Sequence, residues 1–335
     1  MYCTDMKKKV IDENGKVYAT LAEAFRAMGV KNISGKVYRI LDRNGVLHSH
    51  GKTFRYEDPQ TNGKVDPIVD KLKRRYTHEE LEQIARGEGI QKKFIPFPEI
   101  RLDGNHHRAV VISDTHIGSV YSPEEWHDTV AAFVNDPSNK VDCVLHCGDI
   151  VEGLKIGRAG TQIYELTDIG FESQKDKAVA LMRKYERPIY IISGNHDMYF
   201  KEFAGADIVK AIANEVPNIT YVGHDSADID FDGCKVRLFH GGDGNSYALS
   251  YRLQKLVESY SGGSKPNILL AGHVHKFCYI LERNIHAVSV PCMQAQTSFM
   301  RGKKLAAHTG FLVLDFDTAN GEVRNLSVKM YPFYV

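Results

Sequence analysis

Short apolar runs alternate with helix-like segments from about residue 108 onward. Runs of four to seven residues, the size of strands buried on both faces, occupy 109–113, 141–147, 189–193, 236–239 and 268–271. Between the early runs, the pattern predicts helices at about 123–134 and 171–185. Further strands are expected at 310–316 and 323–331. This alternation predicts an α/β layered domain with two sheets in its core.

The beginning of the chain follows a different pattern, in which two helices precede a hairpin. A capping box formed by Thr20 and Glu23 predicts the start of the first helix. Ser34 can cap a second helix, which the Asn-Gly pair at 44–45 ends. Residues 46–56 predict a short hairpin. The side chains expected to face inward in the two helices are Leu21, Ala24, Phe25, Met28, Val37, Ile40 and Leu41.

Three basic residues of the second helix are spaced so that they share its outer face. They stand at i, i+3 and i+7 and are Lys36, Arg39 and Arg43. Helix, turn, basic helix and hairpin are the outline of a winged helix-turn-helix. Residues 15–57 also resemble the small modular DNA-binding domains attached to phage and intron-encoded nucleases. We therefore expect this face to contact DNA, with an ordinary solvated basic face as the alternative.

Composition and charge add a division into parts. The 335 residues are 43% apolar and 25% charged, which is ordinary for a globular protein with a core. The net charge of +1 conceals about +5 in the first 105 residues and about −4 in the rest. We expect a DNA-binding module at 1–60, a helical linker or strap at 61–105, and a catalytic domain at 106–335.

The location expected from the sequence is the cytoplasm. No apolar run approaches the roughly 18 residues that span a membrane, and the first residues lack the apolar centre of a secretory signal. The six cysteines are scattered and form no C-x-x-C pair, which indicates reduced thiols and excludes a zinc finger or a disulfide framework.

Metal-ligand side chains follow each of the five early strands. Open α/β sheets place their sites beyond the carboxyl ends of the strands, so these side chains are expected at one rim. A buried carboxylate such as that of Asp114 is tolerable where a cation compensates its charge. The five segments are Asp114-Thr-His116, Gly148-Asp149-x-x-Glu152, Gly194-Asn195-His196, His240-Gly and Gly272-His273-x-His275.

In this order the motifs resemble the calcineurin-like metallophosphoesterase family, over about residues 108–335. The resemblance implies a β-sandwich flanked by helices, that is a four-layer αββα fold, with a two-metal site. It implies that the first metal is held by Asp114, His116, Asp149 and His275. It implies that the second metal is held by Asp149, Asn195, His240 and His273. By the same match, His196 would contact the phosphate and protonate the leaving oxygen, and Glu152 would orient His196.

The ligand types favour two divalent ions, manganese before iron or zinc, because carboxylate, amide and imidazole groups are mixed and no thiolate is present. Two such ions clamp a phosphate and activate a water. Gly153 stands where phosphoprotein phosphatases of this superfamily carry arginine, and the motifs resemble instead the branch of SbcD-type nucleases and cyclic nucleotide phosphodiesterases. The basic front module favours a DNA phosphodiesterase of viral or mobile-element type. A small-molecule phosphodiesterase or phosphatase is the alternative, and a non-enzymatic scaffold is disfavoured because no ligand is missing.

Overall fold

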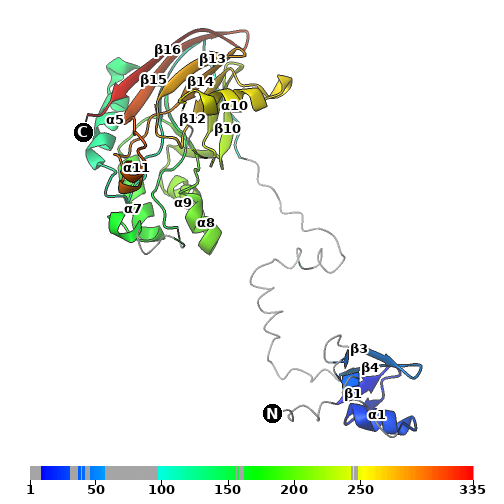
Figure 1. Cartoon of the computed structure of the whole chain (residues 1–335). Coiled ribbons are helices and arrows are strands. Elements are labelled where there is room, and N and C mark those ends of the chain that lie inside the picture. The colour runs from blue at the N-terminus through cyan, green and yellow to red at the C-terminus, as the bar shows by residue number, and fades with distance from the viewer. Residues whose placement is uncertain are drawn as a thin grey trace. The chain divides into compact units, whose positions relative to one another are not determined.

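The computed structural model describes residues 9–30, 37–38, 40–41, 46–56, 81, 97–155, 157, 162–242, 244 and 248–334. The chain divides into two compact units, Met1–Phe94 and Ile95–Val335, which are drawn in Figure 1. None of the helices in the described ranges is both long and apolar enough to cross a membrane. Each unit is described by itself below.

The first unit contains a four-stranded antiparallel sheet in the order β2-β1-β4-β3. Its strands are β1 Val10–Asp12, β2 Val17–Tyr18, β3 Val46–Ser49 and β4 Lys52–Tyr56. One helix, α1 Leu21–Ala27, follows β2. The buried side chains that join sheet and helix are Val10, Tyr18, Leu21, Ala24, Phe25, Leu41, Leu47 and Phe54.

The expected capping box and hairpin are both present. Thr20 Oγ1 accepts the N–H of Glu23 at 3.2 Å, and Glu23 Oε2 accepts the N–H of Ala19 at 2.7 Å. β3 and β4 pair across a tight turn in which His50 and Gly51 have φ of 52° and 72°, the backbone that two-residue hairpins require.

The first unit departs from the expected outline at two points. Strands β1 and β2 precede α1 and were not anticipated, because they are only three and two residues long. The hairpin is therefore half of a four-stranded sheet rather than an isolated wing. Ile40 was expected to face inward but is 38% exposed, whereas Leu41 is buried.

Several predictions for the front of the chain concern residues outside the described ranges. These include the Ser34 cap and most of the linker or strap expected at 61–105. The basic residues Lys36, Arg39 and Arg43 lie outside them as well. The helix-turn-helix interpretation and the three-part domain division therefore stay predictions.

The second unit contains two six-stranded sheets. The first has the order β16-β15-β6-β7-β8-β9 and consists of β6 His106–Ile112, β7 Cys143–His146, β8 Ile189–Ile192, β9 Ile219–Gly223, β15 Gly310–Ala319 and β16 Glu322–Pro332. The second has the order β13-β14-β12-β11-β10-β5 and consists of β5 Ile100–Leu102, β10 Ser226–Phe231, β11 Cys234–Phe239, β12 Ile268–Ala271, β13 Cys278–Glu282 and β14 Ile285–Ser289. Strands β6 to β9 are parallel, as are β11, β12 and β14.

Helices cover both outer faces of the paired sheets, which gives the four layers (Figure 1). Along β6, Val110 and Ile112 belong to the core under the helices, while Ala109 and Val111 belong to the core between the sheets. This alternation follows from the two-residue period of a strand. The helices over the first sheet are α5 Glu124–Asn135, α7 Phe171–Met182 and α9 Ile208–Glu215. On the other side, α10 Tyr251–Ser259 packs on β12 and β14.

The remaining elements are short. They are the helices α8 Met198–Ala204 and α11 Ser298–Gly302, and the 3-10 turns Pro137–Asn139, Ile163–Glu165 and Gly262–Ser264. The expected helix at 171–185 ends three residues early, at Met182, and the strand expected at 141–147 covers only Cys143–His146. The expected αββα sandwich is confirmed, and the carboxyl ends of β6, β7, β8, β11 and β12 lie at one rim.

Candidate metal centre

Five loops meet at the rim, and each follows one strand. The loops place carboxylate, amide and imidazole groups together, and most of these side chains are buried. Five of the residues have a left-handed backbone, with φ between 45° and 78°: Asp114, His116, Asp149, His273 and His275. Such conformations are costly for residues other than glycine and cluster at functional sites.

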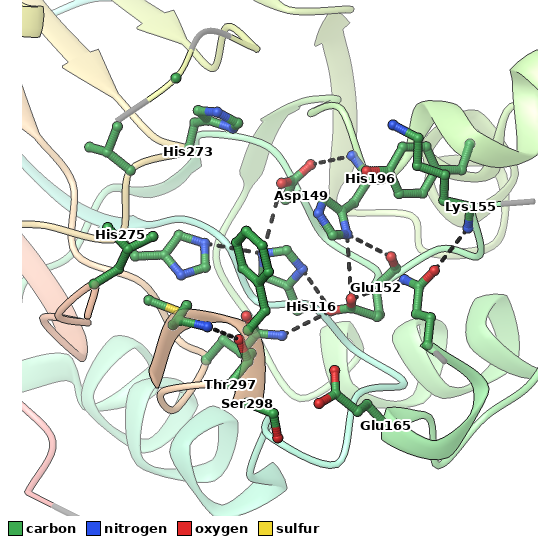
Figure 2. Close-up of a pocket in the computed structure, with 18 residues that line it drawn as sticks. His116, Asp149, Glu152, Lys155, Glu165, His196, His273, His275, Thr297 and Ser298 are labelled. Carbon is green, nitrogen blue, oxygen red and sulfur yellow. Dashed lines mark hydrogen bonds and ion pairs between the residues drawn. The ribbon is translucent and has the colours of Figure 1, made fainter. Parts of the chain in front are cut away.

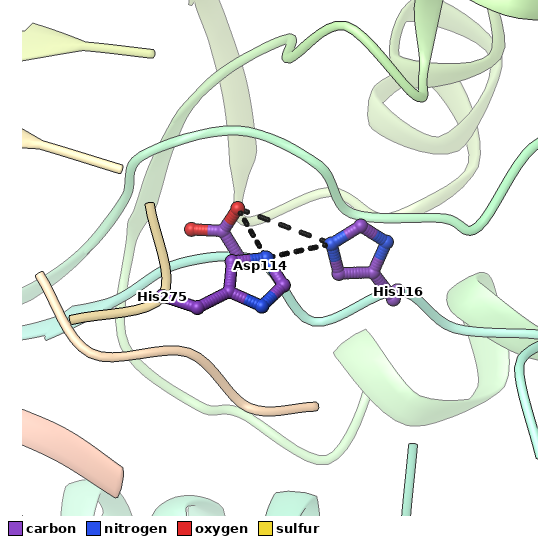
Figure 3. Close-up of side chains that lie close together, drawn as sticks. All are labelled: Asp114, His116 and His275. Carbon is purple, nitrogen blue, oxygen red and sulfur yellow. Dashed lines mark hydrogen bonds and ion pairs between the residues drawn. The ribbon is translucent and has the colours of Figure 1, made fainter. Parts of the chain in front are cut away.

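A first group combines one carboxylate with two imidazoles (Figure 3). Asp114 Oδ1 lies 3.2 Å from His275 Nε2 and 3.9 Å from His116 Nε2, and the two Nε2 atoms lie 3.3 Å apart. All three residues are buried. The main-chain N–H of His273 donates to both oxygens of Asp114, which fixes the orientation of the carboxylate. The three ligand atoms converge on one point and could hold a metal ion.

A second group combines Asp149 with His240 and His273. His240 Nε2 lies 3.1 Å from Asp149 Oδ2 and 3.2 Å from Asn195 Oδ1. On the other side of the ring, His240 Nδ1 donates to the carbonyl of Cys147 at 2.7 Å. This bond leaves Nε2 as the nitrogen available to a metal, the arrangement usual for histidine ligands.

The two groups adjoin one another. Asp149 Oδ2 is 3.8 Å from His116 Nε2, and Asp114 Oδ1 is 4.0 Å from His240 Nε2. The turn before Asp149 needs glycine, because Gly148 has φ of 91° and a Cβ there would lie 2.6 Å from His240 Nδ1. Because its Oδ2 lies close to a histidine of each group, His116 and His240, the Asp149 carboxylate stands between the two groups.

Charge couples the buried acids to the histidines. Burial pushes the pKa of Asp114 up, but the charges of His275 and His240 outweigh burial and hold this pKa below its usual range. For His240, burial lowers the pKa, and Asp149 and Asp114 together raise it to about 9. The pKa of His273 falls to about 4 because of burial and the charge of His240. Carboxylates and imidazoles gathered in one buried cluster are the setting that a divalent cation stabilises.

Glu152 and His196 form the third part of the site. His196 Nδ1 donates to the main-chain carbonyl of Glu152 at 2.7 Å and lies 3.6 Å from its Oε1. Glu152 Oε2 lies 3.0 Å from His116 Nδ1. Figure 2 shows the Glu152 carboxylate between the two imidazoles. Glu152 thus contacts His196 chiefly through its main-chain carbonyl, and its carboxylate is closer to His116.

Four residues that hydrogen-bond to the site were not among the predicted site residues. Gln294 donates to Glu152 Oε2 at 2.8 Å, and Gln162 donates to Oε1 at 3.2 Å. Arg252 donates to the carbonyls that begin the His240 and His273 turns. The supporting residues are Gln162, Asp197, Arg252 and Gln294.

Asp197 accepts the main-chain N–H groups of Ile150, Val151 and Gly194. Burial and the charge of Asp149 raise the pKa of Asp197 to about 7. Asp197 had a sequence signal, since it directly follows Gly194-Asn195-His196. The other three supporting residues lie outside the strand-end motifs and had none, although Gln162 is only 10 positions from Glu152 and Arg252 only 12 from His240.

The strand-end motifs and the αββα layers belong to a known family. The model of the calcineurin-like phosphoesterase superfamily domain matches residues 108–296. The chain belongs to the calcineurin-like phosphoesterase superfamily. This confirms the family expected from the motifs. The family implies divalent metal ions, and the two buried groups, with His240 Nε2 left available, fit such ions.

Two archaeal relatives share part of the chain. The small subunit of DNA polymerase II from Archaeoglobus fulgidus is 24% identical over 84% of this chain and 67% of its own length. The corresponding subunit from Halobacterium salinarum is 23% identical over 66% of this chain and 50% of its own. The chain thus spans about two thirds of the first relative and half of the second.

Solved structures similar to the chain have low identity. A novel archaeal phosphodiesterase is 15% identical with a TM-score of 0.39, covering 66% of this chain and 99% of its own. Vacuolar protein sorting 29 from Cryptosporidium parvum is 15% identical with a TM-score of 0.36, covering 69% of this chain and 100% of its own.

A cavity of about 880 Å³ opens beside the two groups of candidate metal ligands. Its lining includes His116, Asp149, His196, His273 and His275 (Figure 2). The volume lies within the roughly 300–1,000 Å³ of sites that bury a small ligand. A phosphoester in this cavity would therefore reach both metal groups and His196.

Proposed function

We propose that the chain is a phosphodiesterase that uses two divalent metal ions, with manganese preferred over iron or zinc, and that its substrate is DNA. The observation that carries the proposal is the pair of adjoining buried groups, with Asp149 between them and His196 at their edge. The proximity of the side chains proposed as ligands supports an enzyme over a non-enzymatic scaffold.

The proposed ligands of the first ion are Asp114, His116, Asp149 and His275. Those of the second are Asp149, Asn195, His240 and His273. When bound, such ions polarise the phosphoryl oxygens and lower the pKa of a water to give a nucleophile. The protein's own part is to orient the ligands. The bonds from His240 Nδ1 to the Cys147 carbonyl and from the His273 N–H to Asp114 do this.

His196 is the proposed general acid. Its Nδ1 donates to the Glu152 carbonyl, so Nε2 is the nitrogen left for the leaving oxygen. Burial lowers the pKa of His196, but the charges of Asp149 and Glu152 outweigh burial and raise it. This shift favours the protonated ring, which can give a proton to the leaving alkoxide. The His116 and Tyr199 rings pack against it, with centroids at 4.6 Å and 4.9 Å.

DNA is proposed as the substrate on two grounds. The first is the similarity to two proteins named as DNA polymerase II small subunits. The second is the basic first part of the chain, where Lys36, Arg39 and Arg43 are proposed to contact DNA phosphates. A small phosphodiester is the second candidate, because the cavity volume is typical of small-ligand sites.

One parallel assay tests the proposal. The protein is given manganese or a chelator and is incubated with single-stranded DNA, duplex DNA, methyl 4-nitrophenyl phosphate and 4-nitrophenyl phosphate. We expect manganese-dependent cleavage of the diesters, with DNA cleaved at the highest kcat/KM. Undiminished turnover in chelator would contradict the two-metal mechanism. Cleavage of the small diester without cleavage of DNA would favour the second candidate.

A further inference from the structure

The wall of the cavity carries aromatic side chains beside the metal groups. Phe299 and Tyr199 both line it, together with Met300 and Leu305. Phe299 is 54% exposed, whereas its neighbour Met300 is only 7% exposed. Single exposed apolar residues are common on protein surfaces. Phe299 differs because its exposed side chain lines the same cavity as the ligand-type residues.

The segment that carries Phe299 is firmly tied to the domain. Thr297 caps α11 by accepting the N–H of Met300 at 3.2 Å. Arg301 donates to the carbonyl of Gln296 at 2.7 Å, and Gln296 donates to the carbonyl of Leu305 at 2.7 Å. Figure 2 shows Thr297 and Ser298, which precede Phe299, on the side of the cavity away from Asp149 and His273. The Phe299 ring is thus presented from a fixed support.

The Tyr199 ring contacts His196 and Lys155. The centroids of the Tyr199 and His196 rings lie 4.9 Å apart, and Lys155 Nζ lies over the Tyr199 ring, 5.3 Å from its centroid. Tyr199 therefore supports the proposed general acid. Phe299 is 54% exposed and lines the cavity, so it offers a surface to an incoming planar group.

We propose that Phe299 stacks on an unpaired nucleobase next to the scissile phosphate, so that the enzyme cleaves single-stranded DNA or unpaired strand ends. This rests on the proposed function. Aromatic side chains beside a cationic path are how proteins hold single strands without reading sequence. Two exposed lysines, Lys303 and Lys304, directly follow α11 and supply such charge.

The size of the cavity agrees with an unpaired strand. Its volume of about 880 Å³ is that of a site for a small ligand. Duplex DNA, whose major groove alone is about 12 Å wide, is much larger than such a site. A scissile phosphate can reach the candidate metal ligands that line the cavity if its flanking base leaves the helical stack. The Phe299 ring then replaces the lost stacking partner.

A dinucleotide assay tests the stacking contact without assuming exonuclease or endonuclease action. The substrates are dTpdT and its two analogues in which one base or the other is replaced by hydrogen, all with manganese. A stacked base contributes roughly 1–3 kcal/mol, so Phe299→Ala should lower kcat/KM for dTpdT about 5- to 150-fold. The same change should lower kcat/KM less than about threefold for the analogue that lacks the stacked base. Phe299→Trp should retain the activity on dTpdT.

Leu281→Ala is the matched control, since Leu281 is 59% exposed on β13 and does not line the cavity. It should stay within about twofold of the parent on every substrate. An equal loss for Phe299→Ala on dTpdT and on both analogues would indicate a purely structural role and overturn the proposal. Unchanged activity on dTpdT would overturn it as well.

Binding gives an independent measurement. The chain has one tryptophan, Trp126, which is 7% exposed, so Phe299→Trp adds a reporter at the cavity. Oligo(dT) should quench the added fluorescence, while an oligomer of abasic residues should not. Equal quenching by both would overturn the stacking contact. Hydrolysis of methyl 4-nitrophenyl phosphate by the parent protein separates the two claims, because its absence refutes the phosphodiesterase, whereas its presence without a base effect refutes only the stacking.

Discussion

Replacing Glu152 tests whether its carboxylate holds His116 in position to bind a metal. Glu152 Oε2 lies 3.0 Å from His116 Nδ1. The amides of Gln294 and Gln162 donate to the same carboxylate at 2.8 Å and 3.2 Å. A carboxylate beside Nδ1 favours the ring orientation in which His116 Nε2 is directed at Asp114, where the first metal ion is proposed.

The strength of this contact can be worked from the structure. Burial would raise the pKa of Glu152, but the charges of His196 and His116 lower it to about 2. Compared with the ordinary 4.5, this is worth roughly 3 kcal/mol at 1.36 kcal/mol per pH unit, shared between both histidines and the hydrogen bonds. Loss of such a partner behind a metal-binding histidine typically costs about 10- to 100-fold in metal affinity. Glu152→Ala should therefore weaken manganese binding by that factor, and Glu152→Gln, which keeps an acceptor oxygen, by about tenfold.

Manganese affinity is measured by calorimetry or by competition with a metal-sensitive dye, with thermal unfolding as the check on folding. Glu165→Gln is the matched control. Glu165 also lines the cavity, but its carboxylate accepts a hydrogen bond from Tyr121 at 3.4 Å and belongs to none of the ligand groups found in the described ranges. The control should bind manganese within about twofold of the parent. A folded Glu152→Ala variant that binds manganese as tightly as the control would refute the positioning role.

Three further predictions concern the metals, the acid and the front module. Asp149→Asn should lower the manganese content, measured by elemental analysis, more than Asp114→Asn does, because Asp149 stands between both groups; equal contents would contradict the bridging role. His196→Ala should keep its manganese and slow esters with poor leaving groups by roughly 10²–10⁴, while esters whose leaving group needs no proton suffer much less; equal losses would show that His196 is not the acid. Duplex binding should weaken with salt at a log–log slope of about −0.9 per phosphate contact. Changing Lys36, Arg39 and Arg43 together to alanine should flatten that slope by up to about three contacts. Superimposable salt curves for parent and variant would contradict the DNA contact.

The layers and the rim could be predicted because they rest on local patterns. Buried parallel strands are continuous apolar runs, so β7, β8, β12 and the end of β6 stand out in the sequence. Strand β11 is marked instead by alternating buried apolar positions. Each of these strands is followed at once by its ligand-type side chains, so finding the strand end also finds the site. Helix starts were equally local, as the bonds between Thr20, Ala19 and Glu23 show.

The missed features depend on contacts between distant segments. Strands β1 and β2 are too short to carry a periodic signal, and they form because β1 also pairs with β4, more than forty residues later. Gln294 reaches Glu152 across 142 positions of sequence. Phe299 can be recognised as a candidate binding residue only when the fold places α11 at the cavity. Local patterns of apolar and polar residues do not encode such contacts between distant segments.

The strained loops explain why the two ligand groups should respond together. Past the ends of β6 and β7, the main chain continues its pairing: the N–H of Asp114 donates to the carbonyl of Gly148 at 2.9 Å, and that of His116 donates to the carbonyl of Asp149 at 3.1 Å. Left-handed residues persist only where their surroundings over-determine them, and here each strained loop is part of the surroundings of the other. A change that relaxes the backbone at Asp149 therefore also removes the hydrogen-bond acceptor that holds His116. The first group then loses its geometry although none of its side chains has been altered.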